Sequence, residues 1–143
     1  MKRFIVLISI VIIVVVLVSF NYMSFKQEQN KILKYNLEFE KYNQKEIYGT
    51  DLTTIINRVI NINEKNNVEI GNDKRYVNNK NNSISIDIKM TDIEQVYAME
   101  PIYYRGIEEF VQHYGNIQFK CTKIEYHKAT GKVSYLYFEQ ISE

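Results

Sequence analysis

The feature that most constrains this chain is an uncharged apolar run near its amino terminus. Residues 4–20 read FIVLISIVIIVVVLVSF, with no charged residue, glycine or proline and only two serines. As a helix this run is about 26 Å long, close to the ~30 Å hydrocarbon thickness of a bilayer. Residues 21–23 complete the span, with Tyr22 at the membrane interface. The sequence therefore predicts a transmembrane anchor over residues 1–23, with the membrane core at about Phe4–Phe20.

A cleaved signal peptide is the alternative interpretation of the same run. Its apolar region is normally shorter and ends in a small-x-small cleavage site, whereas this boundary reads VLVSFNYM. We therefore favour an uncleaved, single-pass anchor in the cell membrane. Lys2 and Arg3 precede the run, whereas Lys26 is the only basic residue in positions 21–30. The positive-inside rule predicts a cytoplasmic amino terminus and an extracytoplasmic carboxyl-terminal domain.

A helical stalk is predicted over residues 24–47, because no glycine or proline occurs between positions 21 and 46. Its apolar residues recur at helical spacing, which indicates an amphipathic helix. We expect this stripe to dock on the following domain or on another copy of the chain. The stripe consists of Ile32, Tyr35, Phe39 and Tyr42, widened by Leu33 and Leu37.

Gly49, Thr50 and Asp51 are predicted to mark the joint between the stalk and the next helix. Glycine commonly follows the end of a helix, and a Thr or Asp side chain caps the start of one. The residues after this joint repeat as a core-facing stripe, LTTIINRVI. A phosphate-binding loop is a poor interpretation, because it needs a second glycine followed by Lys and Ser or Thr.

The rest of the chain predicts an α+β domain over residues 48–143. Strict alternation in SISIDIKM indicates a half-buried strand over residues 83–90. A helix is expected from Pro101 to residue 114, ended by Gly115. The remaining expected elements are a short hairpin around Gly71-Asn72, a strand over 116–127 with a bulge near Thr122-Lys123, a turn over 128–132 and an antiparallel strand over 133–140. The fold prediction is thus two helices and a mainly antiparallel sheet of three or four strands, with residues 91–100 left open.

Composition narrows the possible functions. The net charge is +1, which gives no field that would draw the chain to nucleic acid. The sequence holds 15 Asn and 14 Lys against 4 Arg, a bias that we attribute to the codons of an AT-rich bacterial genome. Cys121 is the only cysteine, so no intramolecular disulfide forms, and we expect it to be a small buried residue.

No catalytic, cofactor-binding or metal-binding residues are predicted. Cys121 with His127 or His113 is the one conceivable nucleophile and base, but Cys121 and His127 are ~20 Å apart along a strand. Two His and one Cys without close pairing are not a zinc pattern. The candidate interaction surface is Tyr103-Tyr104-Arg105, because Tyr and Arg are enriched at interface hot spots.

The layout of anchor, stalk and antiparallel sheet resembles that of type IV pilins and pseudopilins. Those proteins have a basic leader ending in glycine and a glutamate shortly inside the apolar helix. Here MKRF lacks the glycine and the first acidic residue is Glu28, so the resemblance is one of layout. The stretches KEIYGTDLTTIINRVI and FKCTKIEYHKATGKVSYLYFEQ also resemble uncharacterised single-pass membrane proteins of clostridial-type bacteria, which implies a location and a fold but no activity.

These observations predict a non-enzymatic, membrane-anchored structural or interaction protein of the bacterial envelope, as a component of a surface assembly. A protein partner or self-association is expected, and no specific small molecule is indicated. The alternative is a tethered ligand-binding accessory or sensing domain, with a pocket between helix 103–114 and the sheet.

Overall fold

The computed structural model describes residues 1–141, in two compact units that divide between Lys34 and Tyr35. Helix α1 (Lys2–Glu40) forms the first unit except for Met1, and its last residues belong to the second unit. Its apolar part has a mean hydropathy of 3.1 over 18 residues, and its side chains are exposed. By length and composition, α1 can cross a membrane.

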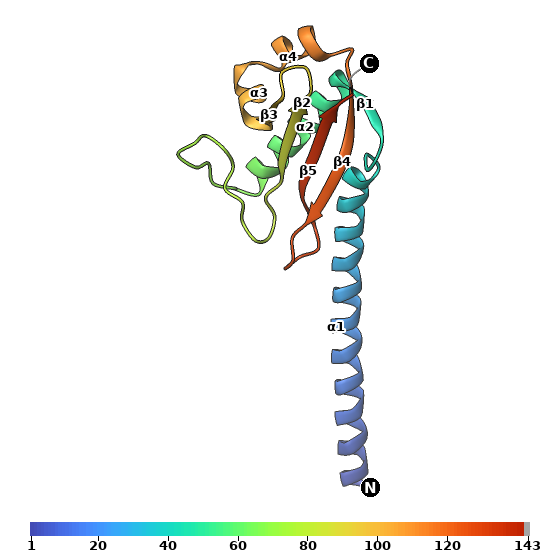
Figure 1. Ribbon diagram of the computed structural model, residues 1–143. Coiled ribbons are helices and arrows are strands. Elements are labelled where there is room, and N and C mark those ends of the chain that lie inside the picture. Colours follow the sequence, from blue (N-terminus) through green and yellow to red (C-terminus); the bar gives the residue numbers. More distant parts are fainter. Residues whose placement is uncertain (142–143) are drawn as a thin grey trace. The chain divides into compact units, whose positions relative to one another are not determined.

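The second unit is an α+β domain, as predicted, built on a five-stranded sheet in the order β1-β4-β5-β2-β3. Neighbouring strands are antiparallel except β5 and β2, which are parallel (Figure 1). The prediction of three or four mainly antiparallel strands is therefore close. The elements are β1 (Glu46–Tyr48), α2 (Gly49–Lys65), β2 (Ser85–Met90), β3 (Gln95–Ala98), α3 (Met99–Arg105), α4 (Ile107–Tyr114), β4 (Gln118–Tyr126) and β5 (Val133–Gln140).

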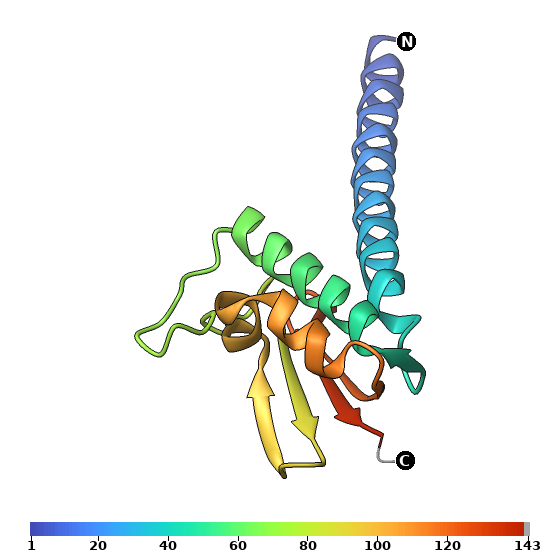
Figure 2. The same cartoon turned by 90° about the horizontal axis from the view of Figure 1, so that it is seen from above.

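The core lies between one face of the sheet and the helices. Figure 2 shows α2 and α4 lying over the strands on the same side. The alternation predicted over residues 83–90 is confirmed within β2, where Ile86, Ile88 and Met90 are buried. The strand begins at Ser85 rather than at Ser83, and Ser83 is buried although it was expected on the polar face. The bulge in β4 is confirmed as well: the register shifts between Cys121 and Lys123, which turns Phe119, Cys121 and Ile124 toward the same core. The turn around Gly71 is also found, as an isolated bridge between Ile70 and Tyr76.

Helix α1 ends earlier than predicted, at Glu40 rather than at residue 47. The chain turns without glycine or proline, since Gln44 adopts a φ of 58° and its N–H donates to the Cys121 carbonyl at 2.8 Å. Residues 46–48 then pair with β4 as β1. The compact domain begins at Tyr35 rather than at residue 48, because Phe39 is buried in its core.

The predicted roles of Gly49, Thr50 and Asp51 are wrong. Gly49 is the first residue of α2, and Tyr48 stands at the N-cap with no side-chain hydrogen bond to the described helix. Backbone carbonyls take the place of a side-chain cap: the Gly49 N–H donates to Ile117 O at 2.9 Å and the Thr50 N–H to Gly115 O at 3.2 Å. Gly49 is required for space, since a Cβ there would lie 2.0 Å from the Tyr114 carbonyl oxygen.

The helix expected over residues 101–114 is two helices, separated at Gly106. This glycine has a φ of 114°, which breaks the helical path between α3 and α4. Gly115 ends α4 as predicted, and its N–H donates to Val111 O at 2.9 Å. The open stretch 91–100 contains β3, which forms an edge of the sheet.

Two buried asparagines hold backbone segments together. The Asn63 side chain donates to Ile84 O at 2.8 Å and accepts from Ile84 N at 2.9 Å. Asn36, near the end of α1, donates to Gly131 O at 2.8 Å and accepts from Val133 N at 3.0 Å. Each amide satisfies a donor and an acceptor that strand pairing leaves unpaired. Genome composition alone therefore does not account for the asparagines.

Gly49→Ala should lower the free energy of unfolding by about 3 kcal/mol, because the new methyl group meets backbone that cannot move aside. Thr50→Ala is the matched control in the same turn. Its side chain caps nothing, so we expect a change within about 0.5 kcal/mol. Denaturant unfolding followed by circular dichroism compares the two variants. If both variants lost the same free energy of unfolding, two conclusions would be wrong: that Gly49 is needed for close packing, and that backbone carbonyls rather than the Thr50 side chain cap α2.

Candidate functional site

A cleft of about 270 Å³ opens between the α3–α4 pair and the adjacent ends of β2 and β3. A pocket between helix 103–114 and the sheet was the expectation for a ligand-binding or sensing domain, and the cleft lies in that region. We call it the α4 cleft. Its lining consists of Met90, Tyr97, Pro101, Ile102, Arg105, Gly106, Glu109, Phe110, His113 and Tyr114.

The inner part of the α4 cleft is apolar. Met90, Ile102 and Phe110 are buried, and the Phe110 ring lies 5.3 Å from Tyr114 and 6.0 Å from the core residue Phe119. Burial, with smaller contributions from Asp92 and Tyr97, raises the pKa of the Tyr114 hydroxyl, which therefore stays protonated. The cleft thus offers an aromatic and aliphatic surface, with the hydroxyl groups of Tyr97 and Tyr114 among its lining residues.

The rim of the α4 cleft carries both signs of charge. Arg105 ends α3 and Glu109 lies in the first turn of α4, and both line the same opening. In the described chain, the ion pairs are those of Arg58 with Glu38 and Lys123 with Glu125. Arg105 and Glu109 are therefore free to meet a ligand. His113 is held differently, with its Nδ1 2.9 Å from the Glu109 carbonyl oxygen.

The structure separates the predicted surface Tyr103-Tyr104-Arg105. Arg105 lines the cleft, whereas Tyr103 packs on the core and Tyr104 is 52% exposed. The two tyrosine rings meet edge to face at 5.5 Å. Sequence reasoning missed Tyr97, Glu109 and His113, which line the same cleft as Arg105. The i, i+4 spacing of Arg105, Glu109 and His113 was a usable signal for the three rim residues.

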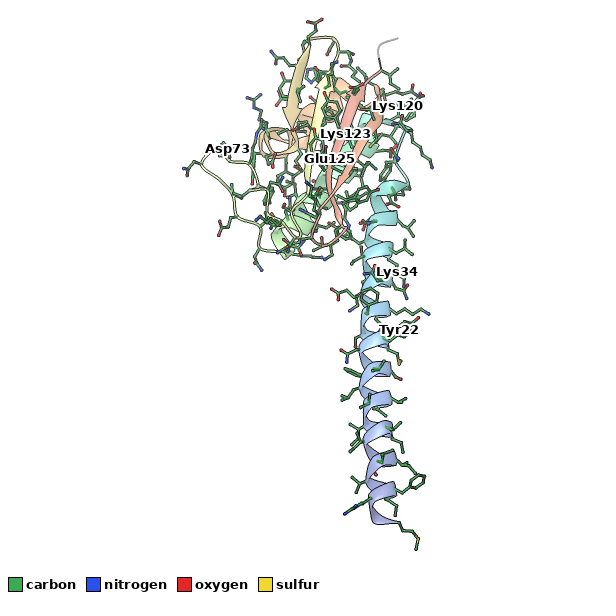
Figure 3. The ribbon with its side chains drawn as sticks, turned by 60° about the horizontal axis from the view of Figure 1, so that its bottom comes forward. Tyr22, Lys34, Asp73, Lys120, Lys123 and Glu125 are labelled. Carbon is green, nitrogen blue, oxygen red and sulfur yellow. The ribbon has the colours of Figure 1, made fainter. Side chains whose placement is uncertain are left out.

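A second candidate surface is the face of the sheet opposite α2, which we call the outer face. Tyr135 and Tyr137 of β5 stack there at 6.3 Å, and the Tyr135 hydroxyl donates to Asp87 at 3.1 Å. Lys123 and Glu125 form an ion pair beside them, and Figure 3 labels both on β4 together with Lys120. Helices α2 and α4 lie over the opposite face. The outer face includes Glu46, Asp87, Lys89, Val96, Lys120, Lys123, Glu125, Tyr135, Tyr137 and Glu139.

The only cysteine and the two histidines lie at different places. Cys121 is fully buried, and its thiol donates to Lys123 O at 3.8 Å. His127 is buried with Nε2 2.7 Å from Ser83 O, and His113 is on the rim of the α4 cleft. Within residues 1–141, no group of three or more metal-ligating side chains is found.

Comparisons with protein families, with curated proteins and with solved structures found no match to this chain.

Cys121 should resist thiol reagents in the folded protein. Burial raises the pKa of its thiol to about 11, so at pH 8 the reactive thiolate is about a hundredfold rarer than in the unfolded chain. Raising the pH through 9 to 11 ionises the unfolded thiol first, which lowers the free energy of unfolding. Ellman's reagent, with and without denaturant, measures the difference. Rapid labelling of folded protein at pH 8 would show that Cys121 is accessible and activated.

Proposed function

We propose that this chain is a non-enzymatic, membrane-anchored interaction protein of the bacterial envelope, acting within a surface assembly. The apolar segment of α1 anchors it, with the amino terminus in the cytoplasm and the α+β domain outside the membrane. The observation that carries the proposal is the outer face, where two stacked tyrosines and a set of charged side chains lie on a sheet face opposite the helices.

Strand β5 explains why this face is suited to a partner. Val133, Leu136 and Phe138 point into the core, whereas Tyr135 and Tyr137 point outward and remain half-buried. Tyrosine offers a large contact area, loses little conformational entropy on binding and keeps a polar tip, which makes it common at interfaces. Cross-strand pairing of Tyr137 with Asp87 and Lys123 surrounds the aromatic pair with charge. This arrangement is typical of an apolar interface centre with a polar rim.

A photo-crosslinking amino acid at Tyr137 tests the proposal in intact cells. If the outer face is an interface, irradiation should give a product above the monomer mass that mass spectrometry identifies as a protein of the envelope. The matched control is the same amino acid at Asp73, an exposed residue in the loop between α2 and β2 (Figure 3). We expect little or no product from that position. Monomer alone at both positions would refute the proposal.

The α4 cleft supports a second candidate function, the binding of a small molecule by the tethered domain. A volume of about 270 Å³ lies just below the ~300–1,000 Å³ of drug-sized sites, so a small ligand fits and a nucleotide cofactor does not. An apolar floor between free charges of opposite sign suits a zwitterion with an apolar side chain, such as a free α-amino acid.

Calorimetric titration of the full chain with leucine and phenylalanine tests this second function. Arg105→Gln and Glu109→Gln should each weaken binding about tenfold or more, because each removes one charged hydrogen-bonding partner. Glu108→Gln is the matched control, since Glu108 is adjacent and exposed but does not line the cleft. An absence of binding, or equal effects of Glu108→Gln and Glu109→Gln, would end this candidate.

A further inference from the structure

A row of alternating charges crosses the outer face at one level of the sheet. Glu46 of β1 is directly opposite Lys120 of β4, Lys120 is opposite Glu139 of β5, and Glu139 is opposite Lys89 of β2. Residues directly opposite each other on neighbouring strands point to the same face. The four side chains therefore read minus, plus, minus, plus across four adjacent strands. We call them the charge row.

The charge row is complementary to itself when it is reversed. A twofold axis along the strands, between β4 and β5, places Glu46 of one copy over Lys89 of another and Lys120 over Glu139. All four contacts across the interface then join opposite charges, and the spacing matches because both rows use the same ~4.8 Å strand separation. With the twofold axis along the strands, the strands of the two sheets run in nearly the same direction, as in the aligned class of sheet-on-sheet packing. A closed twofold contact of this kind is the commonest symmetry of protein assemblies.

From this complementarity we propose that a second copy of the chain docks on the outer face, with the charge rows antiparallel and the tyrosine pairs at the contact. This inference rests on the proposed interaction function and names its partner. The row is available for such contacts, because the ion pairs in residues 1–141 involve Arg58, Glu38, Lys123 and Glu125 and none of its four members. The row sets the register and the partner, whereas the stacked tyrosines supply most of the buried area.

A charge exchange between two variants tests the geometry. In Lys89→Glu, two contacts of the symmetric dimer place Glu46 of one copy against the introduced carboxylate of the other, so we expect at least about tenfold weaker self-association. Glu46→Lys has the corresponding effect, because it places the introduced lysine of one copy against Lys89 of the other. When the two variants are mixed, the reversed residues face each other and all four contacts join opposite charges again. The mixed pair should therefore associate about as strongly as the unaltered chain, although each variant alone does not.

The measurement is energy transfer between full-length copies that carry donor and acceptor tags in the same lipid vesicles, over a series of protein-to-lipid ratios. Lys80→Glu is the control, because it reverses a charge on an exposed loop outside the sheet and should leave association unchanged. Circular dichroism verifies that each variant is folded. Raising the salt from about 0.05 to 0.5 M should weaken the unaltered pair and reduce the contrast between variants.

Three results would overturn the inference: no association of the unaltered chain, no recovery in the mixture, or an equal loss in Lys80→Glu. The first of these is separable from the proposed function. If the copies do not associate and Tyr137 still cross-links to a different envelope protein, the interaction function stands and the second copy is not its partner. Recovery in the mixture alone, with both single variants weakened, supports the antiparallel charge rows.

Discussion

The contact between the start of α2 and the end of α4 is the constraint on which the α+β domain is built. The Tyr114 carbonyl oxygen occupies the space that a side chain at position 49 would need. The same approach lets the carbonyls of Gly115 and Ile117 accept the first N–H groups of α2. One glycine therefore fixes a helix start, a helix end and the beginning of β4 at a single point. The position of α4 over the sheet, and with it the α4 cleft, follows from this contact.

The local pattern of apolar and polar residues was sufficient to predict those helices and strands in which buried residues recur at a regular spacing. Ile84 to Met90 alternate on a sheet with one covered face, and the change of parity after Cys121 predicts the bulge. Strands β1 and β3 are too short to show a period, and they exist because β4 and β2 pair with them. The end of α1 is likewise set by distant contacts, since Asn36 binds the backbone at Gly131 and Val133.

The candidate sites were harder to predict than the fold, because they depend on register. Glu46, Lys89, Lys120 and Glu139 are scattered over the sequence, and only the pairing of four strands aligns them. The predicted surface shows the opposite case, in which residues adjacent in the sequence do not share a surface. Neighbours on a helix point in different directions, which separates Tyr103, Tyr104 and Arg105. The predicted pocket between the helix and the sheet matches the α4 cleft in outline, and the i, i+4 spacing of Arg105 and Glu109 could have placed both on its rim. The division of the helix at Gly106 could not be predicted in the same way, because it follows from a φ of 114°.

The proposed pairing needs both the charge row and the membrane anchor. Exposed ion pairs contribute about 0.2–1 kcal/mol each, whereas association from free solution costs at least ~4 kcal/mol in lost translational and rotational freedom. Four such contacts contribute about 0.8–4 kcal/mol together, so the charge row alone does not offset that cost, and burial of the tyrosine pair has to supply part of the difference. Anchoring in one membrane removes part of the cost beforehand, because both copies are already confined to a plane and share an orientation. The charges then need only to determine the register of the two sheets. Alternating signs are well suited to this, because a shift of one charge row by one strand relative to the other brings like charges together.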